Sequence, residues 1–264
     1  MGSGSGRRTP YELVFGQSGI EEQEFPAIIA EAEASGVADS RRDQFARMSS
    51  VGSLLGRLLP EDVDPASLDD YLDILFHCYH FWQAGRPLYV IEPELVRSLI
   101  ESRPDLRDWS PEGDRRTAYF QFPRNQFWAA VTEGQPPEPA DGMFVRVGNG
   151  ESTEVRLLTV LGMRPGRAGF SVATLVTDVE RAREIDEPGA FRSDIPGADL
   201  AGIYSLQRSS EAATLGLRLL WYLGSYPEAI EKVRGQHDAS EDLDYESPTT
   251  LDHYRVRLVK RPRG

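Results

Sequence analysis

One strongly apolar segment of the sequence carries the residues best suited to chemistry. Asp70, Asp73, His77 and His80 are spaced so that, in a helix, they lie on one stripe. A divalent transition metal accepts the carboxylate of Asp73 and the two imidazoles as ligands. The same groups suit acid–base chemistry, with Asp73 orienting His77. The simplest alternative is that the stripe is the polar face of an amphipathic helix and does no chemistry.

The single cysteine, Cys78, follows His77 directly. Adjacent residues of a helix point about 100° apart, so the two do not form a natural pair of nucleophile and base. The apolar neighbours of Cys78 indicate a buried structural thiol. One cysteine also excludes an internal disulfide framework, which favours a cytoplasmic chain.

A second candidate site consists of polar residues in and around the turns between expected strands. These residues are Tyr119, Gln121, Arg124, Arg164 and Arg167. If the turns converge, the arginines suit an anionic small molecule or the carboxylates of a protein partner. The alternative is that these residues only form turns and cover the surface.

The other sequence signals argue against common activities. The acidic stretch over 237–253 lacks the glycine of a calcium loop, so we expect a solvated segment. The sequence has no phosphate-binding loop, no dinucleotide fingerprint after a strand and no paired cysteines, and no serine-hydrolase elbow follows a strand. These absences lower the expectation of nucleotide hydrolysis, a Rossmann cofactor, serine hydrolysis or structural zinc.

The hydrophobic pattern changes its period near residue 115. Before that point apolar residues recur at helical spacing, most strongly over 67–83. After it, alternation predicts strands over 118–122, 127–131, 143–147, 155–161 and 170–176, with a returning edge strand over 254–259. Helical spacing reappears between these strands and the chain end, over 209–224.

These elements predict an α+β fold: an N-terminal helical segment packed on an antiparallel five- to six-stranded meander, with a long C-terminal helix. We expect a flexible tail over 1–9, a helical subdomain over 10–112, and the sheet with the C-terminal helices over 113–264. The helix over 67–83 has more apolar surface than its short neighbours can cover. It therefore favours packing on the sheet, which would make both halves one compact domain.

Composition sets the class of protein. The 264 residues are 40% hydrophobic and carry a formal net charge of −13, which excludes a disordered chain and argues against a nucleic-acid-binding surface. No apolar run is long enough to cross a membrane. Of the 29 basic residues all but Lys232 and Lys260 are arginine, which favours a prokaryotic source with a GC-rich genome.

Two functions are consistent with these observations. The first is a non-catalytic binding or scaffolding protein that recognises a protein partner or itself, without a cofactor; the lack of a convergent catalytic set and the many aromatic residues favour it. The second is a metal-dependent enzyme or small-ligand sensor with a pocket between the helix over 67–83 and the sheet. That second function requires Asp73, His77 and His80 to face the sheet.

Overall fold

The computed structural model describes residues 6–15, 19–36, 41–59, 63–102, 104, 106, 116–129, 136–148, 154–163, 170–179, 204–205, 209–236 and 247–259. The helices are α1 (Pro10–Phe15), α2 (Ile20–Ala34), α3 (Arg42–Phe45), α4 (Ser49–Leu58), α5 (Leu68–Gln83), α6 (Pro93–Glu101) and α8 (Ser209–Ser225), with 3₁₀ turns at Pro65–Ser67 and Pro227–Ala229. The strands are β1 (Leu88–Ile91), β2 (Thr117–Gln121), β3 (Phe127–Ala129), β4 (Glu138–Val147), β5 (Glu154–Leu161), β6 (Ser171–Asp178), β7 (Tyr204–Ser205), β8 (Ile230–Val233) and β9 (His253–Val256).

The strands form one mixed sheet in the order β6-β5-β4-β2-β1-β9-β8. Strand β1 is parallel to both of its neighbours, β2 and β9, and the other pairs along this order are antiparallel. Strand β3 pairs with the start of β4 and, in parallel, with β7.

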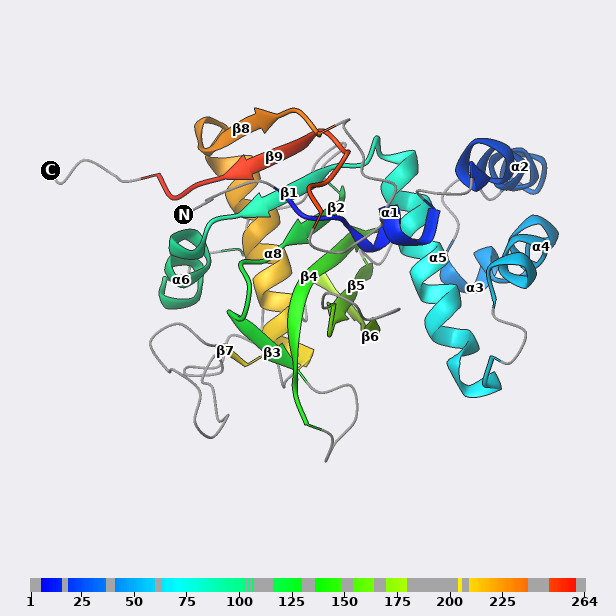
Figure 1. Cartoon of the computed structure of the whole chain (residues 1–264), viewed down its shortest axis with the longest axis horizontal. Helices are drawn as coiled ribbons and strands as arrows, with labels where there is room; N and C mark the ends of the chain where they lie inside the picture. The colour runs from blue at the N-terminus through cyan, green and yellow to red at the C-terminus, as the bar shows by residue number, and fades with distance from the viewer. Residues whose placement is uncertain are drawn as a thin grey trace, which may run out of the picture.

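Helices cover both faces of this sheet. Figure 1 shows α1 to α5 gathered on one side of the strands, while α8 runs along the other side. One apolar core joins α1 to α5 to side chains such as Tyr119, Phe144 and Leu158. A second core joins α6 and α8 to side chains such as Phe120 and Val145. The molecule is therefore layered as helices, sheet and helices.

The buried strands explain why their sequence is so apolar. Every residue from Ala140 to Val147 on β4 is buried, because both faces of the strand are covered. Alternate side chains still separate by face, with Phe144 directed to α5 and Val145 to α8. Gly216 lets α8 approach closely, since a Cβ there would lie 3.1 Å from Leu157 Cδ2 and 3.3 Å from Val145 Cγ2.

The sheet corrects the expected antiparallel meander. Strand β1 lies within the segment expected to be helical, yet it sits between β2 and β9, with Leu88 opposite Tyr119 on one side and His253 on the other. Strand β9 is not an edge strand, because β8 pairs with its far side. A four-residue strand between two helices is too short to show a clear alternation, so the sequence pattern concealed β1.

Two further expectations differ from the structure. Strands β2 and β3 do not pair with each other, as consecutive strands of the expected meander would, because both pair with β4. The long helix α8 is not at the C-terminal end of the fold, because both β8 and β9 follow it. Within the described part of the chain, no helix is long and apolar enough to cross a membrane.

Candidate functional site

The polar stripe of α5 faces the sheet. His77 is 1% exposed, His80 is 5% exposed and Asp73 is buried beside them, whereas Asp70 is exposed. Thr174 on β6 bonds to Asp73, and the His77 ring lies 6.1 Å from the Phe144 ring of β4. The stripe is therefore not a solvated face. It lies between α5 and the sheet, as the second function requires.

Asp73 joins three elements through its carboxylate. Its Oδ1 accepts a hydrogen bond from Arg42 Nε of α3 at 2.8 Å, and its Oδ2 accepts one from Thr174 Oγ1 of β6 at 2.7 Å. Arg42 also bonds to Asp69 on the first turn of α5. Both carboxylate oxygens of Asp73 are thus engaged, which leaves this side chain poorly suited to bind a metal or to orient His77.

The two histidines share a hydrogen-bond pattern. His77 Nδ1 lies 2.9 Å from the backbone oxygen of Asp73, and His80 Nδ1 lies 3.2 Å from Gln83 Oε1. Both partners are acceptors, so each Nδ1 carries the hydrogen and each neutral ring keeps a lone pair on Nε2. Neither Nε2 has a hydrogen-bond partner, and both atoms are buried.

Two arginines lie on the sheet beneath this stripe. Arg146 of β4 and Arg156 of β5 are directly opposite in the antiparallel register. Their guanidinium carbons lie 5.3 and 5.8 Å from the centroid of the Phe76 ring. The same ring lies 4.6 Å from the His80 ring and 5.5 Å from the His77 ring. We call His77, His80, Arg146 and Arg156, which surround Phe76, the α5 polar cluster.

Burial and positive charge keep both imidazoles neutral. Burial lowers the pKa of His77 to about 4. The bond to the Asp73 carbonyl and the charge of Asp73 act to raise it, and the weaker effects of Arg146 and Arg156 act in the same direction as burial. Burial also holds the pKa of His80 well below its usual range, with Arg146 and His77 adding to the effect. At neutral pH the cluster therefore combines two guanidinium cations with two uncharged imidazoles.

The sequence pattern did not identify Arg146 and Arg156. Each is the charged residue within an otherwise apolar part of its strand, Met143–Val147 or Val155–Leu161. A charge inside a strand that is covered on both faces is the signal that was available. The two arginines lie opposite each other only because of the register between β4 and β5, and the sequence alone did not predict that register.

Cys78 takes no part in the cluster. Its thiol is fully buried in the core between α5 and the sheet. Burial raises the pKa of this thiol far above its usual range, so it stays protonated and is a poor nucleophile.

The residues of the second candidate site do not form one pocket. The Tyr119 hydroxyl donates to Asp141 Oδ2 at 2.6 Å, and Gln121 Oε1 accepts the backbone N–H of Arg7 at 2.8 Å. Arg124 is exposed in the turn before β3, and Arg164 and Arg167 lie outside the described residues. Tyr119 and Gln121 therefore secure other parts of the chain.

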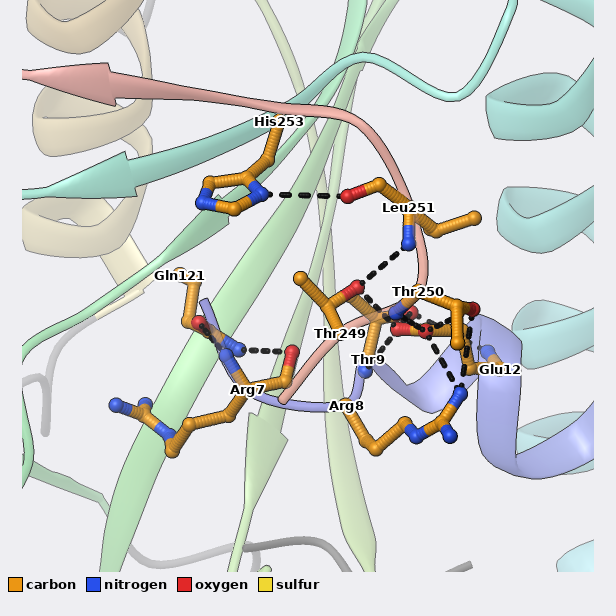
Figure 2. A network of polar contacts seen from close by, with 9 residues as sticks. All are labelled: Arg7, Arg8, Thr9, Glu12, Gln121, Thr249, Thr250, Leu251 and His253. Carbon is orange, nitrogen blue, oxygen red and sulfur yellow. Dashed lines mark hydrogen bonds and ion pairs between the residues drawn. The ribbon is translucent and has the colours of Figure 1, made fainter. Parts of the chain in front are cut away.

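Gln121 belongs to a second polar network, which Figure 2 shows. Segment 6–9 lies along segment 247–250, with Arg8 N bonded to Ser247 O and Thr249 N bonded to Gly6 O. The buried Glu12 carboxylate accepts bonds from Arg8, Thr9, Thr249 and Thr250. Residues 6–9, expected in a flexible tail, are thus bonded to the body of the protein. We call this network the N-terminal clamp.

His253 lies near the clamp and resembles the cluster histidines. Its Nδ1 lies 3.2 Å from the backbone oxygen of Leu251, and its buried Nε2 has no hydrogen-bond partner. Burial lowers its pKa as well. It is a single imidazole, whereas His77 and His80 lie together beside two guanidinium groups.

The described residues offer little for a metal ion. Among them, no group of three or more His, Cys, Asp or Glu side chains could hold one. Most of the acidic stretch over 237–253 lies outside the described part of the chain. Binding of a metal by Asp73, His77 and His80 remains a prediction. The hydrogen bonds that Asp73 makes to Arg42 and Thr174 do not favour it.

No protein-family model and no curated protein matches this chain in sequence.

Proposed function

We propose that this protein binds a small ligand in the α5 polar cluster, between α5 and the sheet. The observation that carries the proposal is the pair of buried Nε2 atoms, on His77 and His80, that have no hydrogen-bond partner. A buried polar atom without a partner costs about 1–3 kcal/mol, so a group that bonds to both Nε2 atoms would recover part of that cost. A ligand between α5 and the sheet would supply the missing partners.

The geometry of the cluster favours specific recognition. The Nδ1 bonds of His77 and His80 fix the orientation of both rings, so both Nε2 lone pairs are held in place before a ligand arrives. Phe76 provides an apolar wall between the polar groups. A few fixed polar groups around an aromatic wall are typical of small-molecule sites.

The rim of the cluster gives solvent access to its charged groups. Arg156 keeps 14% of its side-chain surface exposed and Arg42 keeps 23%. Arg156 belongs to the cluster, and Arg42 is bonded to Asp73 beside it. Binding rather than covalent catalysis is favoured because the cluster contains no hydroxyl, thiol or carboxylate nucleophile and its neighbour Cys78 is held as a thiol.

Native mass spectrometry of untagged protein, purified without chelator, tests this proposal, followed by a thermal-shift screen with small molecules. The double variant His77→Phe/His80→Phe keeps two rings among aromatic neighbours but removes both Nε2 atoms. We expect ligand-induced stabilisation to be lost in this variant. The matched control is His253→Phe, which removes an equivalent buried Nε2 outside the α5 polar cluster. Equal stabilisation of all three proteins by every ligand would contradict the proposal.

A second candidate function is self-association through β6. This eight-residue strand ends the sheet within the described residues, and Val176 on it is 45% exposed. It carries no charge before Asp178, so two copies could pair edge to edge without bringing like charges together. Sedimentation of wild type and Val176→Lys tests this function, with Leu68→Lys, at a second large apolar residue exposed among the described residues, as the control. We expect only Val176→Lys to reduce a dimer.

A further inference from the structure

The body of the protein holds segment 6–9 in the way that a binding protein holds a peptide. Arg7 forms an antiparallel β-bridge with Pro248, and the Thr249 N–H donates to the backbone oxygen of Gly6 at 3.0 Å. When an extended peptide binds beside a strand, main-chain bonds of this kind give affinity and the fit of its side chains gives specificity. Segment 6–9 makes both kinds of contact.

The side chain of Gln121 binds the backbone of Arg7. Its Oε1 accepts the Arg7 N–H at 2.8 Å, and its Nε2 donates to the Arg7 backbone oxygen at 3.2 Å. Figure 2 shows the Gln121 amide facing this backbone, while the Arg7 side chain extends away from Glu12. Gln121 therefore fixes the position of one residue of the segment without selecting its side chain.

The buried carboxylate of Asp141 selects the side chain. Arg7 Nη2 donates to Asp141 Oδ1 and to the backbone oxygen of Phe122, both at 2.9 Å. The Tyr119 hydroxyl donates to Asp141 Oδ2 and so fixes the orientation of the carboxylate. A lysine ammonium ends one bond short of the arginine Nη atoms, so lysine does not reach the same position. We call Gln121, Phe122 and Asp141 the arginine site.

The position before the arginine selects glycine. A Cβ on Gly6 would lie 2.9 Å from Thr249 Cγ2 and 3.2 Å from Val90 Cγ2. Thr249 is not free to rotate away, because its hydroxyl donates to Glu12 Oε2. The close approach of the Gly6 backbone therefore requires a residue without a side chain.

We propose that the arginine site binds peptide segments in which glycine precedes arginine, and that Gly6 and Arg7 occupy it as an internal ligand. A partner peptide with this sequence displaces the two residues and makes the same bonds. The net charge of −13 favours the approach of an arginine-bearing peptide. The arginine site shares no residue with the α5 polar cluster, so this proposal is independent of the proposed function.

Occupation by Arg7 has a measurable consequence. The apparent affinity for a free peptide is lowered in proportion to the fraction of molecules in which the site is open. The substitution Arg7→Ala removes the competing side chain but leaves Gln121, Phe122 and Asp141 in place. This variant should therefore bind a matching peptide more tightly than wild type does.

Isothermal titration with the tripeptide acetyl-Ser-Gly-Arg-amide tests the proposal, because this probe keeps the backbone groups on both sides of its arginine. Arg7→Ala should bind it at least tenfold more tightly than wild type. Arg57→Ala, which removes an arginine ion-paired with Glu24 on another part of the surface, should bind it as wild type does. Adding Asp141→Asn to Arg7→Ala should weaken binding at least tenfold.

Two matched peptides test the selectivity. Acetyl-Ser-Ala-Arg-amide and acetyl-Ser-Gly-Lys-amide should each bind Arg7→Ala at least tenfold more weakly than the Gly-Arg peptide. If Arg7→Ala binds the Gly-Arg peptide no more tightly than wild type, or binds all three peptides alike, the proposal is overturned.

Hydrogen exchange of wild type keeps the proposal testable if Arg7→Ala does not fold. The Arg7 N–H is bonded to Gln121, and the Tyr119 N–H is bonded to the Pro87 oxygen beside it in the sheet. If segment 6–9 opens while the sheet stays folded, the Arg7 N–H should exchange at least a hundredfold faster than the Tyr119 N–H, after correction for intrinsic rates. Equal protection would mean that the segment leaves only on global unfolding, and no peptide could then compete for the site.

Discussion

Glu12 on α1 and Thr249 before β9 are 237 positions apart in sequence, yet the Thr249 hydroxyl donates to Glu12 Oε2 at 2.8 Å. The same carboxylate accepts the backbone N–H groups of Thr9 and Thr250. One buried side chain thus ties the start of the described chain to the segment that leads into β9 (Figure 2). The clamp is a structural device, and its energy can be measured independently of any ligand.

We expect Glu12→Gln to lower the free energy of unfolding by about 2–4 kcal/mol. The substituted amide would direct an NH₂ group at hydroxyl and N–H donors that now meet a carboxylate oxygen. Urea denaturation measures the change, with Glu22→Gln at an exposed site of α2 as the control. A change below about 0.5 kcal/mol, the size of an ordinary surface substitution, would show that the clamp contributes little.

Gly142 on β4 lies where the neighbouring strand β2 leaves no space for a side chain. A Cβ at this position would collide with the backbone oxygen of Phe120 and with the Tyr119 hydroxyl. Gly142→Ala should therefore destabilise the protein by about 2 kcal/mol or more, because strand backbone cannot move aside. Gly52→Ala, in α4 with open space around the added methyl, should stabilise it by about 0.5–1 kcal/mol. Thermal denaturation of the two variants compares these opposite signs directly.

The buried histidines should make stability depend on pH. His77 has a folded pKa of about 4, below its ordinary value, so the unfolded chain binds the proton more tightly. Stability is therefore fully present above about pH 6.5 and falls as the pH drops toward 4, by about 3 kcal/mol for this residue. Urea denaturation of ligand-free wild type and His77→Phe across this pH range isolates the contribution of His77 to the free energy of unfolding. Parallel curves for the two proteins would show that His77 does not titrate on unfolding.

The sequence predicted the polar stripe of α5 but not whether this stripe faces the sheet or solvent. The spacing of Asp73, His77 and His80 is a local property, so it was readable from the chain alone. Which side of the helix meets the sheet depends on long-range packing, because α5 is apolar around most of its circumference. The opposition of Arg146 and Arg156 depends likewise on strand register.

The two parallel pairings were also beyond the sequence pattern. Strand β1 brings α5, α6 and the segment after residue 247 together, and such pairing joins residues far apart in the chain. Local alternation predicted β2 and β4 to β6 because these strands are long enough to show it. The clamp had no local signal, since Glu12 and Thr249 are ordinary polar residues until the fold places them together.

The tautomers of His77 and His80 give the most direct test of the site. Free imidazole prefers to carry its hydrogen on Nε2, but here Nδ1 faces the Asp73 carbonyl and Gln83 Oε1. Two-dimensional ¹H–¹⁵N NMR of the ring nitrogens should therefore show Nδ1–H rings for both residues at pH 7. His253 serves as an internal reference, because its Nδ1 also lies against a backbone oxygen. Nε2–H rings in the ligand-free protein would mean that the lone pairs on which the site depends are absent.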